Sequence, residues 1–195
     1  MRGKRLLQTL KLCTISSGAQ RAEYLRENNV FASMGKNCTW MDRKVPLYAK
    51  LIRIGDNVHF ASDVTLVTHD ITHKMLNGSG ELKEKYDADR FNEKVGCIDI
   101  GSNVFIGSGV TVLYDVKIGD NVIIAAGAVV SKDIPSGTVA GGVPARKICS
   151  FDEYLDNRNE ACQNDVMASR QTLPPETVAM LWESFENERT DSLSE

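Results

Sequence analysis

The sequence lacks the features that mark several protein classes. No apolar run approaches the roughly 18 residues that a membrane-spanning helix needs, and Gln8, Thr9 and Lys11 interrupt the basic start of the chain, so we expect neither a membrane span nor a secretory signal. The five cysteines form no CxxC pair and no regular spacing, which favours reduced, mostly buried thiols over a disulfide framework. Motifs of the GxxxxGK, GxGxxG and HExxH types are also absent. We therefore expect a cytoplasmic protein.

Charge and size describe a soluble globular protein with an acidic tail. The 195 residues carry a formal net charge of -3 at pH 7, which does not suggest a nucleic-acid partner. Residues 151–195 hold 11 acidic and 3 basic side chains, a net charge of -8, so the other 150 residues carry 20 minus 15, or +5. We interpret the acidic tail as the solvated face of amphipathic helices.

The dominant feature that the sequence does contain is an apolar residue at every sixth position. The unbroken run comprises Ile100, Ile106, Val112, Ile118, Ile124 and Val130, and an earlier run comprises Ile54, Phe60 and Leu66. A six-residue period fits neither an α-helix at 3.6 residues per turn nor an alternating strand. It is typical of a hexapeptide β-helix, in which short strands joined by tight corners stack into a continuous core.

The position three residues after each of these apolar residues should form a corner. Eight of the nine such positions hold Gly, Asn or Asp, which adopt positive φ at least cost. They are Asn57, Asp63, Asn103, Gly109, Asp115, Asn121, Gly127 and Asp133. The ninth is His69, an unusual choice for a corner that only has to turn. We single it out as a candidate for catalysis; the alternative is one more tolerated corner residue.

The repeat is interrupted once, and the interruption divides the chain. From Leu66 to Ile100 there are 34 residues where 6 would continue the coil, so 28 extra residues leave the β-helix directly after His69. Loops of that length are more often functional than not. We predict a helical segment at 1–29, a β-helix domain at 30–148 with an excursion loop at 72–99, and a C-terminal helical extension at 149–195, whose last helix starts at the PPE of 174–176.

Four segments resemble a known family. They are IGDNV at 54–58, IGSNVFIGSGVTVL at 100–113, IGDNVIIAAGAVVSKDIP at 118–135 and GGVPARKI at 141–148. They resemble the hexapeptide-repeat acyltransferases, in particular the sugar and surface-polysaccharide O-acetyltransferases and the related xenobiotic acetyltransferases. The resemblance implies an all-β fold with helical appendages, in which the central domain is a left-handed parallel β-helix. The left hand comes from the resemblance alone, because the general rule for parallel crossovers predicts a right-handed connection. The resemblance also implies acetyl-CoA as donor and an obligate homotrimer with active sites between subunits.

The resemblance also indicates catalytic residues. VTLVTHD at 64–70 resembles the segment that holds the family's catalytic histidine, so we expect His69 to act as the general base that takes the proton of an attacking hydroxyl. Asp42 overlaps imperfectly with the segment where sugar acetyltransferases carry a polar residue that helps to hold the acceptor. A solvated corner aspartate is the alternative for Asp42. Asp70 is a candidate for orienting the imidazole.

The donor candidates lie further along the repeat. Small residues at successive corner positions would let a pantetheine arm approach the backbone amides, and the cations that follow could meet the nucleotide phosphates of coenzyme A. The small residues are Ala125, Ala126 and Gly127, and the cations are Lys132, Arg146 and Lys147. Any one of these cations could equally be an ordinary surface charge.

We therefore expect an acetyl-CoA-dependent O-acetyltransferase that acts on a hydroxyl of a sugar or polysaccharide precursor. The alternatives are a xenobiotic or antibiotic acetyltransferase, a scaffold without catalysis, and a metal lyase resembling the γ-type carbonic anhydrases, which bind zinc through three histidines. The three histidines here are spaced by 10 and 4 residues, which does not place them on neighbouring coils, so we expect no metal. The polar excursion is expected to hydrogen-bond a hydroxyl-rich acceptor; the alternative is an arm that stabilises the trimer.

Overall fold

The structure is a computed structural model that describes residues 2–161 and 173–192. The chain divides into two compact units, Met1–Tyr154 and Leu155–Glu195. The predicted domain boundaries stay predictions. Helix α5 (Phe151–Ala161) crosses the division, and α6 (Pro175–Ser192) begins within the PPE sequence that predicted its start.

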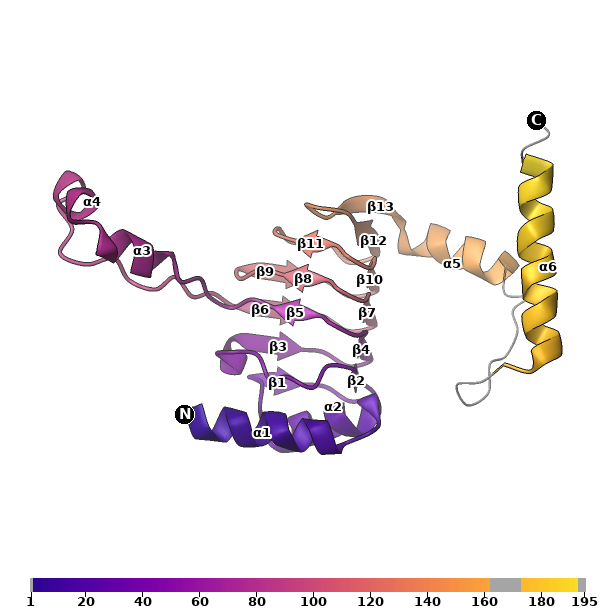
Figure 1. Ribbon diagram of the computed structural model, residues 1–195, viewed down its shortest axis with the longest axis horizontal. Coiled ribbons are helices and arrows are strands. Elements are labelled where there is room, and N and C mark those ends of the chain that lie inside the picture. Colours follow the sequence, from indigo (N-terminus) through magenta and orange to yellow (C-terminus); the bar gives the residue numbers. More distant parts are fainter. Residues whose placement is uncertain (1, 162–172, 193–195) are drawn as a thin grey trace. The chain divides into compact units, whose positions relative to one another are not determined.

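The larger unit is built from three sheets of short strands that stack as a parallel β-helix (Figure 1). Sheet A contains β1 (Ser33–Met34), β3 (Ile52–Ile54), β6 (Ile98–Ile100) and β9 (Val116–Ile118). Sheet B contains β2 (Thr39–Trp40), β4 (Val58–Phe60), β7 (Val104–Ile106), β10 (Val122–Ile124), β12 (Thr138–Gly141) and the antiparallel β13 (Arg146–Ser150). Sheet C contains β5 (Thr65–Leu66), β8 (Thr111–Val112) and β11 (Val129–Val130). The predicted parallel β-helix with helices at both ends is confirmed.

The six-residue period of the sequence determines the register of the sheets. Residues six apart lie on successive sheets of one coil, and every third member of the series is the Cα partner of its equivalent in the next coil, so like side chains stack on like. The stacks are Ile54 on Ile100 on Ile118, Phe60 on Ile106 on Ile124, and Leu66 on Val112 on Val130. All nine side chains are buried in one hydrophobic core. Burial of apolar area at each level stabilises the stack, because no single coil encloses a core of its own.

The corners follow the sequence prediction at seven of nine positions. Their φ values lie between 53° and 72°. These residues are Asn57, Asp63, Asn103, Gly109, Asp115, Asn121 and Gly127. The three asparagines, which turn the chain from sheet A to sheet B, also bond to one another, since Asn57 Nδ2 donates to Asn103 Oδ1 and Asn103 Nδ2 to Asn121 Oδ1, each at 3.0 Å. His69 and Asp133 are outside the positive-φ set.

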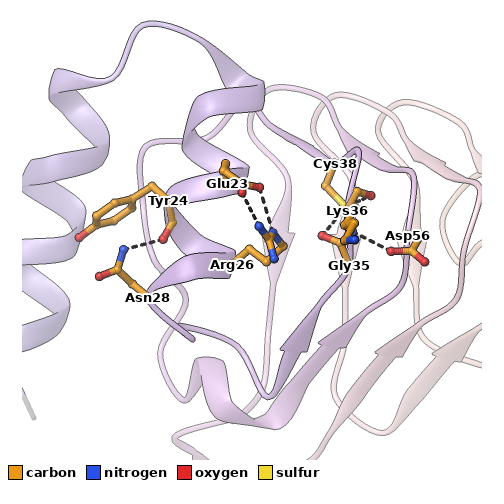
Figure 2. A network of polar contacts seen from close by, with 8 residues as sticks. All are labelled: Glu23, Tyr24, Arg26, Asn28, Gly35, Lys36, Cys38 and Asp56. Atoms are coloured by element: carbon orange, nitrogen blue, oxygen red, sulfur yellow. Dashed lines mark hydrogen bonds and ion pairs between the residues drawn. The ribbon is translucent and has the colours of Figure 1, made fainter.

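The N-terminal helices cover the first coil. Helix α1 (Arg2–Thr14) precedes α2 (Gly18–Glu27), both lie within the helical segment predicted at 1–29, and α2 contacts β2. The buried Arg21 guanidinium in α2 donates to the carbonyls of Trp40 at 2.8 Å and Met41 at 3.1 Å, so the charge is hydrogen-bonded where it is buried. Figure 2 shows the Glu23–Arg26 ion pair of α2 and the Lys36 amide that donates to Asp56 at 2.7 Å and ties the first coil to the second.

The expectation of mostly buried cysteines is wrong. Among the described cysteines only Cys38 is buried, and burial raises the pKa of its thiol. Cys13 and Cys97 are exposed and Cys149 is half-buried, all as free thiols. Cys97 faces outward because it precedes the inward-facing Ile98, and neighbours along a strand point to opposite faces. Cys162 lies outside the described residues.

The predicted excursion loop contains two short helices, α3 (Thr72–Gly78) and α4 (Gly80–Lys85). It leaves the stack after β5 and returns at β6 (Figure 1). None of the helices in the described ranges combines the length and apolar composition that a membrane crossing requires.

Substitution of Gly107 tests the close spacing of the coils. A Cβ at this position would lie 2.6 Å from the Ala126 nitrogen and 2.9 Å from the Ile124 oxygen, both backbone atoms of the next coil. We expect Gly107→Ala to lower the free energy of unfolding by about 1–3 kcal/mol through overpacking, measured by urea denaturation at fixed protein concentration.

Gly78→Ala is the matched control for this measurement. No atom lies within 4 Å of the Cβ position at Gly78, and the residue ends α3. We expect a neutral effect or a gain of up to about 1 kcal/mol from helix propensity. Equal stability of Gly107→Ala and the wild type would contradict the proposed packing.

Candidate active site

His69 lies at the neck where the excursion leaves and rejoins the β-helix. It forms an isolated antiparallel bridge with Val95. The Asp70 amide donates to the Lys94 carbonyl at 3.0 Å and the Gly96 amide to the Thr68 carbonyl at 2.9 Å. The two ends of the excursion therefore pair with each other in place of a corner. Antiparallel pairing requires extended backbone, which explains why His69 does not adopt the positive φ of a corner residue.

The imidazole of His69 is half-buried and lacks a described hydrogen-bond partner. Its Nδ1 atom is buried, and no donor or acceptor among the described residues reaches it. Tyr48 packs edge-on against the ring, with 5.3 Å between centroids and an interplanar angle of 89°. The Tyr48 hydroxyl donates to Glu93 of the returning segment at 3.0 Å, and this bond raises the pKa of the phenol. The ring is thus positioned by packing, and its basic nitrogens are not used by the fold.

Asp70 anchors the neck instead of contacting the catalytic candidate. Its Oδ1 atom accepts from Thr72 Oγ1 at 2.6 Å and from the Thr72 amide at 3.1 Å, and its Oδ2 atom accepts from the Tyr114 hydroxyl at 2.9 Å. The bonds from Thr72 and then Tyr114 hold the pKa of Asp70 below its ordinary value. None of the described hydrogen bonds joins Asp70 to His69. The expected role of Asp70 in orienting the imidazole therefore has no support from these contacts.

The coil that contains Tyr114 makes a second contact with the neck, through Lys94 of the returning segment. Lys94 pairs with Asp115 at 2.7 Å and lies over the Tyr114 ring, 5.6 Å from its centroid. Both Tyr114 and Asp115 come from the segment between β8 and β9. The neck is therefore fixed to the next coil by contacts on both of its strands.

Asp42 lies in the first coil, whereas His69 lies at the end of the second. Asp42 lies two residues after β2 of sheet B, and its Oδ1 atom accepts from the Arg43 amide at 3.0 Å. His69 follows β5 of sheet C. No described contact joins the two side chains, and the role of Asp42 with the acceptor stays a prediction.

The small-residue corner lies at the passage from sheet B to sheet C. Ala125, Ala126 and Gly127 connect β10 to β11. The Ala125 amide donates to the Ala140 carbonyl and the Gly127 amide to the Ser108 carbonyl, each at 2.8 Å. Of these three amides only that of Ala126 makes no hydrogen bond within the described part of the chain. A pantetheine arm could therefore bond to Ala126 but not to its neighbours.

The three candidate phosphate ligands are exposed near the last coils. Lys132 follows β11 of sheet C, whereas Arg146 and Lys147 begin β13 at the end of sheet B. His69 lies where sheet C gives way to sheet A, and the small-residue corner lies where sheet B gives way to sheet C. The described contacts of one chain do not bring the donor candidates to His69.

The other two histidines differ from His69. His59 in β4 is held on both sides, by Thr39 Oγ1 at 3.1 Å from Nδ1 and Asn57 Oδ1 at 2.9 Å from Nε2, so its role is structural. His73 lies in α3. Within the described ranges, no group of three or more His, Cys, Asp or Glu side chains is arranged to hold a metal ion.

The sequence did not indicate the aromatic partners of the neck. Tyr48 lies in the irregular first coil between β2 and β3, where the six-residue period cannot be followed. Tyr114 directly precedes the corner residue Asp115 but has no recurring equivalent. Both contacts join residues far apart in the sequence, and no local pattern indicates such pairs.

Comparisons with known proteins agree on the family. Residues 98–132 match the family model "Bacterial transferase hexapeptide (six repeats)". The chain is 35% identical over 175 residues to galactoside O-acetyltransferase of Escherichia coli (strain K12), covering 78% of this chain and 79% of that protein. It is 45% identical over 105 residues to protein CapG of Staphylococcus aureus, and this match spans 53% of the chain and about half, 55%, of that relative. A maltose O-acetyltransferase from Clostridium difficile 630 superposes with a TM-score of 0.53 and 28% identity, over 76% of this chain and 85% of that one.

The Asp70–Tyr114 bond has a direct test by titration. Because the folded pKa of Asp70 is lowered, this group stabilises the fold above the ordinary aspartate pKa of about 3.9, and the contribution is lost as the pH falls through the folded pKa. We expect Tyr114→Phe to raise the pKa of Asp70 towards its ordinary value, as followed by carboxyl-carbon NMR. Tyr24→Phe, in α2 and away from the neck, is the control. An unchanged pKa in Tyr114→Phe would show that the bond does not form in solution.

Proposed function

Since the chain belongs to the hexapeptide-repeat acetyltransferases, we propose that it transfers an acetyl group from acetyl-CoA to a hydroxyl of a sugar or polysaccharide precursor. The observation that carries this proposal is the unpaired imidazole of His69, positioned at the break in the repeat. Relatives with this fold are named for acetyl transfer to galactosides and maltose, which supports a sugar acceptor.

In the proposed mechanism His69 is the general base. A sugar hydroxyl is a poor nucleophile at neutral pH, and removal of its proton during attack on the thioester carbonyl accelerates the reaction by roughly 100- to 10,000-fold. The imidazole takes this proton as the oxygen–carbon bond forms, and returns it to sulfur as the carbon–sulfur bond breaks. The packing of Tyr48 against the ring limits its rotation, which supports a fixed direction of proton transfer.

The donor is proposed to lie along the corner at 125–127. The free amide of Ala126 can donate to an amide carbonyl of the pantetheine arm, and the exposed Lys132, Arg146 and Lys147 can meet the phosphates. These groups and His69 occupy different edges of one chain. A second copy is needed to bring the edge of one subunit to that of its neighbour, and we therefore propose a homotrimer with shared active sites. Phe105 of sheet B, which is 46% exposed, supplies apolar surface suited to such a contact.

Replacement of His69 tests the catalytic assignment. We expect His69→Ala to lower kcat by at least about a hundredfold, the low end for a general base, with coenzyme A affinity and oligomeric mass unchanged. The assay is thiol release from acetyl-CoA across a panel of sugars and antibiotics. His59→Gln, at a histidine that only bridges Thr39 and Asn57, is the control and should stay close to wild type. Turnover by His69→Ala near the wild-type rate would exclude His69 as the base.

The shared-site proposal predicts a defined mass in solution. Light scattering at micromolar concentration should give three times the 21.5 kDa of one chain. A monomer with full activity would rule out a site built from two subunits.

A further inference from the structure

The excursion contains an open polar depression that is separate from the donor candidates. Its volume is about 600 Å³. The lining residues are His73, Lys74, Asn77, Gly78, Lys83, Asp89 and Arg90. They come from α3, from α4 and from the segment that follows α4.

The depression carries an excess of positive charge. Lys74, Lys83 and Arg90 line it together with a single carboxylate, that of Asp89. None of the salt bridges among the described residues involves these three cations. Like charges gathered on one short segment repel each other, so an anion bound between them would relieve an unfavourable interaction.

One of the lining residues, His73, has a ring nitrogen without a described hydrogen-bond partner. The Nδ1 atom of His73 is buried and has no hydrogen-bond partner in the described structure. A buried polar atom without a partner costs free energy that a ligand can recover. His73 is the second residue of α3, and the first, Thr72, bonds to Asp70 at the neck, so this end of the depression adjoins the neck.

The backbone around the depression is held in place by local hydrogen bonds. Asn77 Nδ2 donates to the Phe91 carbonyl at 2.8 Å, and the Phe91 amide donates to Asn77 Oδ1 at 2.9 Å. Ser79 Oγ accepts from the Leu82 amide at 3.2 Å and caps α4. The first pair fixes the residue next to Arg90, and the second orients the helix that carries Lys83. Because its amide is used in this way, Asn77 supports the site and does not contact the acceptor.

We propose that the depression binds an anionic group, a phosphate or a carboxylate, carried by the acceptor. This inference rests on the proposed acetyl transfer and narrows the acceptor from a hydroxyl-rich sugar to a negatively charged one. The Arg90 guanidinium offers a fork of donors that matches either oxyanion, and the two lysines add point charges. The charged group is held on the excursion while a hydroxyl of the same molecule reaches His69 at the neck.

Paired acceptors that differ only in charge test the proposal. The assay compares galactose with galactose 1-phosphate and with galacturonic acid, in the wild type, in the triple variant K74Q/K83Q/R90Q and in Lys85→Gln. Lys85 is the matched control, because it lies in α4 with Lys83 but does not line the depression. Its Nζ atom lies 5.5 Å from the centroid of the Tyr86 ring.

We expect the wild type and Lys85→Gln to favour at least one charged acceptor by about tenfold or more in kcat/KM. The triple variant should lose this preference and keep its activity with galactose within about twofold. Equal use of charged and neutral sugars by the wild type would overturn the inference and leave the acetyl transfer itself established.

Binding can also be measured without turnover. The chain has three histidines, so imidazole NMR signals are few. Titration with galactose 1-phosphate, and with inorganic phosphate as a second probe, should shift the signals of His73 saturably and leave those of His59 unchanged. The triple variant should show no saturable shift. Absence of any shift in the wild type would overturn the site even if no acetylated sugar had been found.

Coenzyme A also carries phosphate groups, so a separate measurement tests whether the depression binds the donor instead of the acceptor. Calorimetric titration compares coenzyme A with dephospho-coenzyme A in the wild type and the triple variant. We expect the triple variant to bind both as tightly as the wild type does. A loss of affinity confined to coenzyme A would assign the depression to the donor and overturn its assignment to the acceptor.

Discussion

Hydrogen bonds between successive coils hold strands of only two or three residues in the body of the β-helix. Strands this short are not stable alone, and they persist because each pairs in register with equivalents above and below. The register in turn buries Ile106 and its stacked partners and aligns the asparagine ladder at Asn57, Asn103 and Asn121. Each coil must therefore return its strands to the same register, and a long insertion has to leave the stack between two strands.

The excursion is a consequence of this constraint, and it creates the candidate active site. Where the chain leaves and returns, the corner is replaced by an antiparallel neck that places His69 opposite Val95. Tyr48 packs on the imidazole, and Tyr114 holds Asp70 from the next coil. The regular coils supply a rigid base for these contacts, while the break supplies side chains that the repeat itself has no place for. Chemistry at the break therefore does not conflict with the packing of the core.

One chain does not complete the proposed site, because the residues proposed for catalysis and for donor binding lie on different edges of the β-helix. His69, the proposed base, lies at the passage from sheet C to sheet A, and the free amide of Ala126 lies at the passage from sheet B to sheet C. The proposed trimer would bring such edges together without altering either. The excursion adds a third element, because Lys74, Lys83 and Arg90 provide positive charge beside the neck in a chain whose net charge is negative. The donor, the base and the acceptor would then be held by separate parts of the assembly.

The β-helix, the register of its coils, seven of its nine corners and the position of its interruption can all be predicted from the sequence, because they follow from a period that is repeated locally. The sequence also singled out His69, since a histidine broke the Gly, Asn and Asp pattern of the corners. Tertiary structure alone decided that His69 pairs with Val95, that Tyr48 packs on its ring, and that the cations of the excursion line one depression. It also showed that Cys97 is exposed and that the amides of Ala125 and Gly127 are already bonded. These contacts join side chains that are distant in the sequence or lie in segments without a period, and their geometry depends on how the coils stack.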